Sequence, residues 1–379
     1  MKNFIFTSLF IALFGLISCN KQNSDIILMD ENDFKTSIDG KSVDLYTLKN
    51  SEGMTMQVTN FGGRIVSLWV PDKNGKFADV VFGHKNLDGY TNYVGERFIG
   101  CVVGRYANRI ANGEFSLDSI TYNVPKNNNG QSLHGGLKGL DQVVWTVDSV
   151  AGDMIAMHYV SPDGEEGYPG TLTIKMKYTL TPDNGVEINY SATTDKPTVV
   201  NLSNHSIFNL KGEGKGTIND LLLTINADSI TPVNANLIPT GELMAVDGTP
   251  FDFRKPTAIG SRVDADDQQL KNCRGYDHNF VLSRKSKSDV ELVASVADPE
   301  SGRVMEVYTD QPGLQFYGGN FFDGNGLGKY GDTFKYREGF ALETQKFPDS
   351  PNHPNFPSTR LNPGETYTQT CIYKFSTMK

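Results

Sequence analysis

The stretch TLTIKMKYTLTPDNGVEINYSAT, residues 171–193, contains the pattern that decides the fold class of this chain. Apolar and polar residues alternate over 171–180 and again over 186–193, which is typical of β-strands with one buried face. Between them, the Asp-Asn-Gly cluster at 183–185 has the composition of a tight turn. The stretch therefore predicts two neighbouring antiparallel strands joined by a short connection.

Similar alternating runs recur along most of the chain, and no capped amphipathic segment is long enough for a dominant helix. Many short strands at regular spacing are typical of a sandwich or barrel, and no break in composition marks a second domain. We therefore predict an all-β fold, a large single-domain β-sandwich over residues 31–379. The further strands expected are 55–59, 65–70, 78–82, 143–150, 154–160, 221–225, 279–282, 292–296, 304–308 and 369–375, with a hairpin over 114–124.

The charge and composition of the chain limit its possible partners. The 379 residues carry a net charge of -9, and Lys and Arg are scattered rather than clustered, which argues against a nucleic-acid surface. We therefore expect a small or uncharged partner. Cys101, Cys273 and Cys371 have no C-x-x-C spacing, so they predict buried or unpaired thiols rather than a disulfide framework or a thiolate metal site.

The N-terminus has the features of a targeting segment. After a positive charge, residues 4–17 form an apolar core that is too short to span a bilayer as a mature helix. The sequence Leu-Ile-Ser-Cys at 16–19 resembles the lipobox of bacterial lipoproteins, and a plain secretory signal with a chance cysteine is the alternative. We expect a signal peptide over 1–18, a lipid on Cys19 as the only membrane contact, a polar tether over 19–30, and a location at the cell envelope.

Several connections are too long for hairpin links, and loops of this length in a compact domain are usually functional. They cover residues 90–112, 127–141, 211–219 and 264–277. Polar side chains that can bind a ligand or transfer a proton stand where strands meet such loops. These side chains are Arg105, Asn108, Arg109, His134, His205, Asp277 and His278.

Each of these residues also has a purely structural interpretation. Either Arg105 or Arg109 could bind a ligand or form a structural salt bridge. His134 could be a surface histidine in a turn, and His205 a satisfied core histidine. Two histidines with a carboxylate could also hold a metal ion. The sequence has no H-E-x-x-H motif, no glycine-rich phosphate loop and no G-x-S-x-G, so nothing sequential supports a metal, nucleotide or serine-nucleophile site.

Glu343 stands at an unusual position for a carboxylate. It ends the apolar run 339–342, which has the character of a buried strand, and a proline-rich loop follows within 346–358. Glutamate is rarely fully buried without a partner. Glu343 is therefore either an exposed strand-end residue or a positioned acid in a cleft.

Six motifs follow one another along the chain: GRYANRI (104–110), LHGG (133–136), NHSIFNL (204–210), GYDHNF (275–280), QPGLQFYGGNF (311–321) and LETQKFPDSPNHPNFPS (342–358). Taken in this order, they resemble the motifs of the aldose 1-epimerases, the galactose mutarotases. The resemblance extends from about Val43 to the C-terminus. It implies a β-sandwich of the galactose mutarotase type that interconverts the α and β anomers of free aldoses without a cofactor.

The resemblance also implies roles for individual residues. Glu343 matches the general base of the family and His205 its general acid, and the proline-rich loop is then expected to form one wall of the cleft. The sugar-binding positions are matched by Asn108, Arg109, His134, Asp277 and Gln315, and not by Arg105.

Two details of sugar contact stay open at this point. Ile207 replaces the aromatic residue that is usual in the family, which could change a sugar contact. An aromatic side chain is expected to stack on the sugar ring, and Phe316, Tyr317 and Phe321 are equal candidates. A non-catalytic carbohydrate-binding lipoprotein and an enzyme acting on a modified sugar are the competing functions; the expected partner in each case is a small carbohydrate.

Overall fold

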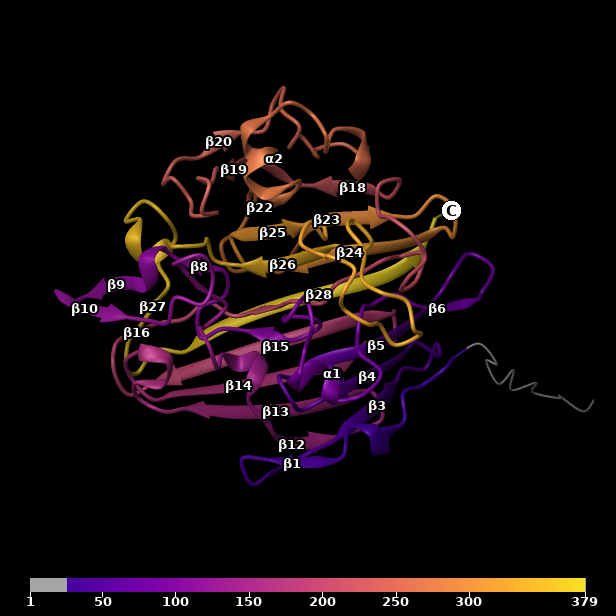
Figure 1. The fold of residues 1–379 in the computed structure, drawn as a ribbon, viewed down its shortest axis with the longest axis horizontal. Coiled ribbons are helices and arrows are strands. Elements are labelled where there is room, and N and C mark those ends of the chain that lie inside the picture. Colours follow the sequence, from indigo (N-terminus) through magenta and orange to yellow (C-terminus); the bar gives the residue numbers. More distant parts are fainter. Residues whose placement is uncertain (1–25, 379) are drawn as a thin grey trace, which may run out of the picture.

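The computed structural model describes residues 26–378, which form an almost entirely antiparallel β structure (Figure 1). The predicted signal peptide and Cys19 lie outside the described residues. Met29 already belongs to the fold, because its N–H donates to Gln57 Oε1 at 2.8 Å and its carbonyl accepts from Gln57 Nε2 at 3.0 Å. The predicted end of the tether at residue 30 is therefore too late. Within 26–378, no helix has the length and apolar character needed to cross a membrane.

The largest sheet contains the strands that the opening stretch predicts. Residues 172–180 alternate between buried and more exposed positions, as their sequence indicates, and pair with 185–194 in the expected hairpin. Across the sheet, the strands are β12 (Thr146–Val150), β13 (Met154–Ser161), β14 (Leu172–Leu180), β15 (Gly185–Thr194), β28 (Tyr367–Thr377), β24 (Arg303–Thr309), β23 (Glu291–Ala297), β18 (Leu222–Ile225) and β21 (Thr257–Ala258).

A five-stranded sheet carries most of the predicted site residues. Its strands, in order, are β20 (Met244–Ala245), β19 (Ala227–Thr231), β22 (Asp277–Leu282), β25 (Gly313–Tyr317) and β26 (Ala341–Gln345). Gln315 lies opposite Glu343 in the register, and Asp277 lies opposite Tyr317. Because side chains alternate along a strand, these four residues share one face of the sheet.

Smaller sheets and short helices complete the structure. A four-stranded sheet contains β3 (Leu45–Lys49), β4 (Thr55–Thr59), β5 (Arg64–Pro71) and β6 (Phe77–Asp79). Short pairs are β1 (Thr36–Ile38) with β2 (Lys41–Val43), β9 (Glu114–Leu117) with β10 (Ile120–Asn123), β7 (Val102–Val103) with β17 (Ser203–Asn204), β8 (Arg109–Ile110) with β11 (Ser132–Leu133), and β16 (Thr198–Val199) with β27 (Arg360–Leu361). Within 26–378, the α-helices are α1 (Asp88–Thr91), which ends at the start of the expected loop 90–112, and α2 (Gln268–Cys273), which lies within the expected loop 264–277.

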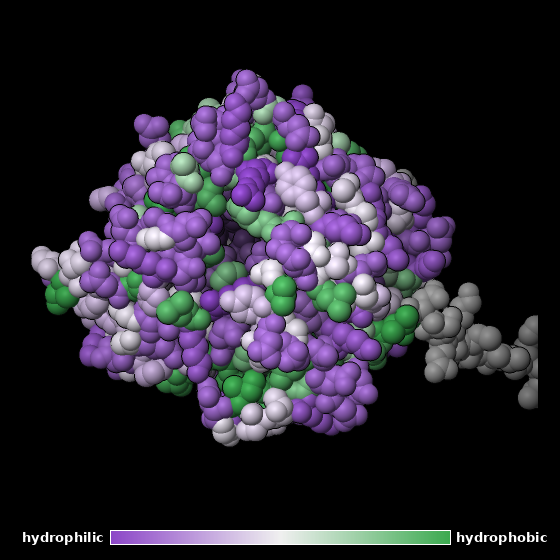
Figure 2. All heavy atoms as spheres, in the orientation of Figure 1, coloured by the Kyte–Doolittle hydropathy of each residue, from purple (hydrophilic) through white to green (hydrophobic). Residues whose placement is uncertain are grey.

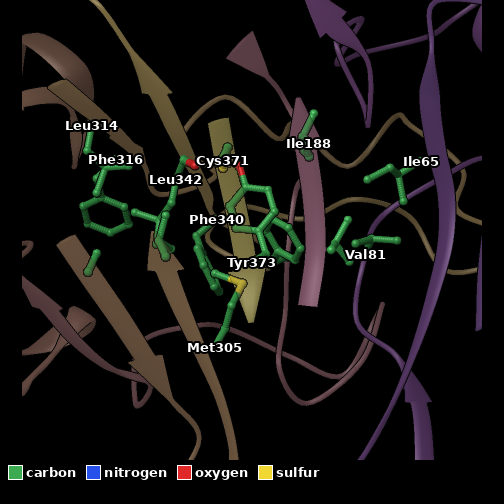
Figure 3. Packing of buried hydrophobic residues seen from close by; sticks show 14 of the residues in the cluster. Ile65, Val81, Ile188, Met305, Leu314, Phe316, Phe340, Leu342, Cys371 and Tyr373 are labelled. Atoms are coloured by element: carbon green, nitrogen blue, oxygen red, sulfur yellow. Dashed lines mark hydrogen bonds between the residues drawn. The ribbon is translucent and has the colours of Figure 1, made fainter. Parts of the chain in front are cut away.

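The main hydrophobic core lies between the sheets (Figure 3). Phe316 and Leu342 belong to the face of the five-stranded sheet opposite the site residues, and Tyr373 on β28 donates its hydroxyl to the Leu342 carbonyl at 2.8 Å. Ile188 on β15 and Ile65 on β5 extend the same cluster. One face of β25 and β26 is thus fixed by packing, which leaves the other free to line a cavity. The three described cysteines are buried and free, as predicted.

Lys329 fixes the connection between β25 and β26 to the rest of the fold. Its fully buried ammonium lies 2.8 Å from Asp79 Oδ2 and 3.0 Å from Glu213 Oε2. It also donates to the carbonyls of Val66 and Val81 at 2.7 Å. This connection precedes the strand that carries Glu343, so the ion cluster contributes to the position of the site.

Replacing Lys329 with methionine is expected to lower the free energy of unfolding by about 3–5 kcal/mol, because it leaves buried carboxylates without their cation. Urea unfolding of the two proteins measures the difference. Lys335→Met is the matched control: its ammonium is exposed and lies 4.0 Å from Glu338, so we expect a change below about 0.5 kcal/mol. Equal losses for the two variants would contradict this account of the cluster.

Candidate active site

A cavity of about 400 Å³ opens beside β26, where the surface in Figure 2 is hollowed near its centre. A volume of this size is within the range of small-molecule sites. Most predicted site residues line the cavity, although they come from widely separated parts of the chain. They are Asn108, Arg109, His134, His205, Asp277 and Glu343.

Glu343 and His205 face each other inside the cavity. Glu343 Oε1 lies 3.7 Å from His205 Nε2, and the two side chains are only 2% and 7% exposed. Glu343 occupies the centre of β26 rather than its end, so the interpretation as an exposed strand-end residue is wrong. Its Oε2 atom is buried and has no hydrogen-bond partner within 26–378, so no hydrogen bond to that atom stabilises the ionised carboxylate.

Backbone pairing holds His205 in place from both sides. Its N–H donates to the Cys101 carbonyl at 2.8 Å, and its carbonyl accepts from the Gly100 N–H at 3.0 Å. The flanking asparagines brace the surrounding segments: Asn201 Nδ2 donates to the Ala107 carbonyl at 3.1 Å, and Asn204 Nδ2 to the Tyr178 hydroxyl at 3.0 Å. The asparagine-rich motif therefore fixes the backbone that presents His205 to the cavity.

Arg109 and Asp277 form a second polar group in the cavity. Arg109 Nη1 lies 4.0 Å from Asp277 Oδ2, close enough for both to hold the hydroxyl groups of one small polyol. Gln315 is not part of the cavity wall. Instead, its Nε2 donates to Asp277 Oδ1 at 2.7 Å and holds that carboxylate, so Gln315 acts on the cavity through Asp277.

His134 and Asn108 are held together by reciprocal contacts between neighbouring turns. The Asn108 N–H donates to His134 Nδ1 at 3.1 Å, and the His134 N–H donates to the Asn108 carbonyl at 3.0 Å. Both residues have left-handed backbone conformations, with φ of 63° and 52°. Because Nδ1 accepts a hydrogen bond, the proton of the neutral ring is on Nε2, where it can be donated to a ligand.

Burial shifts the acid and base strengths of the central groups. It raises the pKa of Glu343 well above the usual value, and the negative charges of Asp277 and Glu96 add to this, while Arg109 opposes it. Burial lowers the pKa of His205 to about 4, and the backbone of His205 itself and of Phe98 opposes the shift. Each shift makes the charged form more reactive: an ionised Glu343 is a stronger base, and a protonated His205 is a stronger acid.

His134, His205 and Glu343 also have the composition of a two-histidine, one-carboxylate metal site. Their ligand atoms lie within 4.8 Å of one another. The hydrogen bond from Asn108 occupies the Nδ1 lone pair of His134, so metal binding through Nε2 would require the ring to lose its remaining proton. The donor set therefore fits proton transfer to a sugar better than it fits a resident cation.

The structure decides several alternatives that the sequence left open. Arg105 is structural, because it donates to the carbonyls of Pro169 and Gly170 at 2.7 and 2.8 Å. Ile207 is fully buried in a hydrophobic cluster and does not line the cavity, so the structure gives it no direct contact with a ligand there. Phe316 is also in the core, which leaves Tyr317 and Phe321 as the stacking candidates.

The proline-rich loop is not a wall of the cavity, contrary to our expectation. It supports the segment that carries Arg109 from behind. Tyr106 donates its hydroxyl to the Phe347 carbonyl at 3.0 Å, the Asp349 N–H donates to the Arg109 carbonyl at 2.8 Å, and Asp349 Oδ1 accepts from the Ala111 N–H at 2.9 Å. The loop thereby determines where Arg109 stands.

Some cavity residues were not predicted. They are Tyr93, Glu96, Arg97, Phe98, the asparagines at 127–129, Leu237 and Asp323. The ring of Phe98 packs edge-on against His134, with 4.6 Å between centroids, and tilts over His205 at 6.0 Å. Most of these residues lie in long connections that the sequence marks as functional, but nothing in their types distinguishes them from ordinary loop residues.

Comparison with known proteins places the chain in a family. Residues 44–374 match the family described as aldose 1-epimerase. The chain belongs to the aldose 1-epimerase family. Among curated members, galactose mutarotase of Rattus norvegicus is 45% identical over 338 residues, which cover 89% of this chain and 95% of the relative. Aldose 1-epimerase of Escherichia coli K12 is 37% identical over 342 residues, covering 89% and 96%.

Solved structures of the aldose 1-epimerase type have the same architecture. An aldose epimerase homologue from C. elegans superposes with a TM-score of 0.82 at 30% identity, covering 89% of this chain and all of that chain. Galactose 1-epimerase from Lactobacillus acidophilus gives a TM-score of 0.78 at 28% identity, covering 91% and 98%. The predicted all-β sandwich is thereby confirmed.

Proposed function

We propose that this chain interconverts the α and β anomers of free aldoses such as galactose and glucose, with Glu343 as general base and His205 as general acid. The placement of these two groups 3.7 Å apart inside the cavity is the main support for the proposal. Polarimetry on freshly dissolved α-D-galactose tests it. We expect the rotation to reach equilibrium faster with the protein than in buffer alone, and an unchanged rate would contradict the proposal.

The reaction needs two proton transfers at one carbon. Glu343 removes the proton of the anomeric hydroxyl while His205 gives a proton to the ring oxygen, so that the bond between that oxygen and the anomeric carbon breaks. The aldehyde carbon of the open chain then rotates. Closure on the other face returns each proton to the group that supplied it. Because both oxygens are bonded to the same carbon, the base and the acid must be close neighbours, as they are here.

The other cavity residues bind and orient the sugar. Arg109 and Asp277 hold hydroxyl groups by charge-assisted hydrogen bonds. His134 donates a hydrogen bond from Nε2, and Asn108 fixes the orientation of its ring. Tyr317, whose ring lies parallel to that of Phe321 with 6.0 Å between centroids, offers an aromatic face for the sugar ring.

The rate is expected to depend on pH as a broad bell. The active form of the pair carries one proton, which is on His205 while Glu343 is ionised. A second, inactive form has the same proton on Glu343 and a neutral His205. Both forms hold the same number of protons, so pH does not change the ratio between them. The fraction in the active form is therefore constant between the two pKa values of the pair. Below about pH 4, the pKa of His205, a second proton binds, and above the raised pKa of Glu343 the pair loses its proton.

Measuring kcat/KM for D-galactose from below pH 4 to alkaline pH checks this dependence on pH, because kcat/KM reports the protonation states of the free enzyme. Circular dichroism at each pH controls for unfolding. A value of kcat/KM that does not fall on the alkaline side would contradict the requirement for a protonated His205.

Two other functions have less support. A non-catalytic sugar-binding protein would not need a base and an acid in contact range, and both are present. A sugar-phosphate epimerase needs free cations for the phosphate. The arginines that line the cavity, Arg97 and Arg109, already face Asp141 and Asp277. Anchoring at the cell envelope through a lipid on Cys19 stays a prediction of the sequence.

A further inference from the structure

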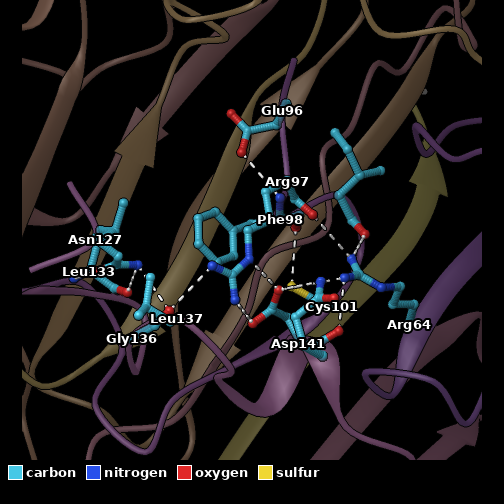
Figure 4. A network of polar contacts seen from close by, with 12 residues as sticks. Arg64, Glu96, Arg97, Phe98, Cys101, Asn127, Leu133, Gly136, Leu137 and Asp141 are labelled. Carbon is cyan, nitrogen blue, oxygen red and sulfur yellow. Dashed lines mark hydrogen bonds and ion pairs between the residues drawn. The ribbon is translucent and has the colours of Figure 1, made fainter. Parts of the chain in front are cut away.

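Glu96 is a carboxylate in the cavity wall that the proposed reaction does not use. It lies half-buried between α1 and β7, and its Oε1 accepts from the Phe98 N–H at 3.2 Å (Figure 4). Phe98 packs on the rings of His134 and His205, so this hydrogen bond ties the Glu96 carboxylate to the centre of the site. The hydrogen bond thereby positions the Glu96 carboxylate at the cavity wall.

No cation neutralises Glu96 in the part of the chain that the structure describes. The adjacent Arg97 points toward Asp141 instead: its Nε and Nη2 donate to the two carboxylate oxygens of Asp141 at 2.8 and 2.9 Å (Figure 4). Its Nη1 donates to the Gly136 carbonyl at 3.2 Å. Arg109 faces Asp277 instead. Burial raises the pKa of Glu96; the Phe98 N–H opposes this shift, and the charge of Asp277 adds to it.

The cavity as a whole has a surplus of negative charge. The Glu343–His205 pair carries one proton and is neutral as a whole. Glu96, Asp277 and Asp323 also line the cavity, and among the residues described Arg109 is the cationic wall residue that is not paired with a group outside it. A substrate that carries a positive charge would supply the countercharge that Glu96 lacks. A substrate with a carboxylate or phosphate would be repelled at the same place.

We propose that Glu96 makes this cavity selective for aldoses that carry an ammonium group over aldoses that carry an acidic group, and that amino aldoses are therefore substrates. The proposal rests on the proposed anomer exchange and specifies the substrate class of the same site. An ammonium group is a strong hydrogen-bond donor with three protons, and Glu96 offers it a carboxylate whose Oε1 is held by the Phe98 N–H.

The test compares three hexoses of one configuration: D-galactosamine, D-galactose and D-galacturonic acid. For each, kcat/KM for anomer exchange is measured above the spontaneous rate at pH 6.5 and low salt, where the amine is protonated and the acid ionised. We expect the wild-type protein to process galactosamine at least as efficiently as galactose, and galacturonate roughly tenfold less efficiently or worse. Equal values for the amino and the acidic sugar would overturn the proposal.

Glu96→Gln removes the charge and keeps the size of the side chain. We expect the kcat/KM for galactosamine, relative to that for galactose, to fall roughly tenfold. The kcat/KM for galacturonate, relative to that for galactose, should rise by a similar factor. Asp323→Asn is the matched control, because this carboxylate is exposed at the edge of the cavity, where water screens its charge. For this variant we expect less than about a threefold change in either ratio of kcat/KM values.

Ratios within one variant separate charge selection from damage to the fold or to the reaction. A Glu96→Gln variant that slows all three sugars equally would overturn the proposal, because it would show a structural role for Glu96. Failure of the proposed function has a different signature, since the wild-type protein would then not accelerate anomer exchange of D-galactose at all.

Discussion

Replacing Glu343 with glutamine is expected to lower kcat for anomer exchange by roughly 10²- to 10⁴-fold, the usual contribution of a general base, while KM changes little. Glutamine keeps the size of the side chain but cannot take the proton of the anomeric hydroxyl. The other groups that hold the sugar, Arg109 and Asp277, remain in place. Polarimetry on freshly dissolved α-D-galactose, at substrate concentrations on both sides of KM, measures kcat and KM separately.

Glu306→Gln serves as the control for this variant. Glu306 also lies in a strand, β24, but outside the cavity, so the substitution should leave both constants unchanged. Thermal unfolding of the two variants shows whether glutamine at the buried position disturbs the fold. A Glu343→Gln protein that is folded and retains the wild-type kcat would show that the base is another group.

Replacing His205 with glutamine is expected to lower kcat by a similar factor of roughly 10² to 10⁴, because the ring oxygen then leaves without a proton donor. The backbone contacts of residue 205 with Gly100 and Cys101 do not depend on its side chain, so the segment should keep its position. The same polarimetric assay measures the loss. His158→Gln is the control, since that histidine lies on β13 and pairs with Asp148 outside the cavity.

The variant that lacks both groups gives a sharper test of their joint action. Glu343 and His205 transfer their protons in one step, so removing the second group should cost little once the first is gone. We expect the double variant to be about as slow as the slower single variant. A loss equal to the product of the two single losses would mean that the groups act independently, and would contradict the pairing.

The sequence predicted most strands of the largest sheet, because alternation and turn residues are local properties, but it did not predict β3 or β19. Residues 55–59 form β4 as expected, and the hairpin of β14 and β15 begins and ends within about one residue of its prediction. Strand β25 was not predicted, although it carries Gln315. The strand begins with Gly313 directly after Pro312 and is followed by Gly318 and Gly319, and glycine and proline are residue types that are depleted in strands.

The candidate site could be predicted only as a set of residues. Six motifs contain Glu343, His205 and the other predicted site residues, most of which line the cavity, but their contacts depend on register between strands that are distant in the sequence. Register placed Phe316 in the core and Gln315 behind Asp277, which no local pattern indicates. Glu96 was missed because its importance comes from the absence of a countercharge, which only the direction of the Arg97 side chain reveals.

The most direct test of paired proton transfer by Glu343 and His205 is exchange NMR of the anomeric protons of D-galactose at equilibrium. This measurement follows α and β forms without any net reaction, so it reports the exchange step itself. We predict exchange cross-peaks within seconds for the wild-type protein and none above the spontaneous rate for Glu343→Gln or His205→Gln. Equal exchange rates for the wild-type protein and both variants would contradict the account.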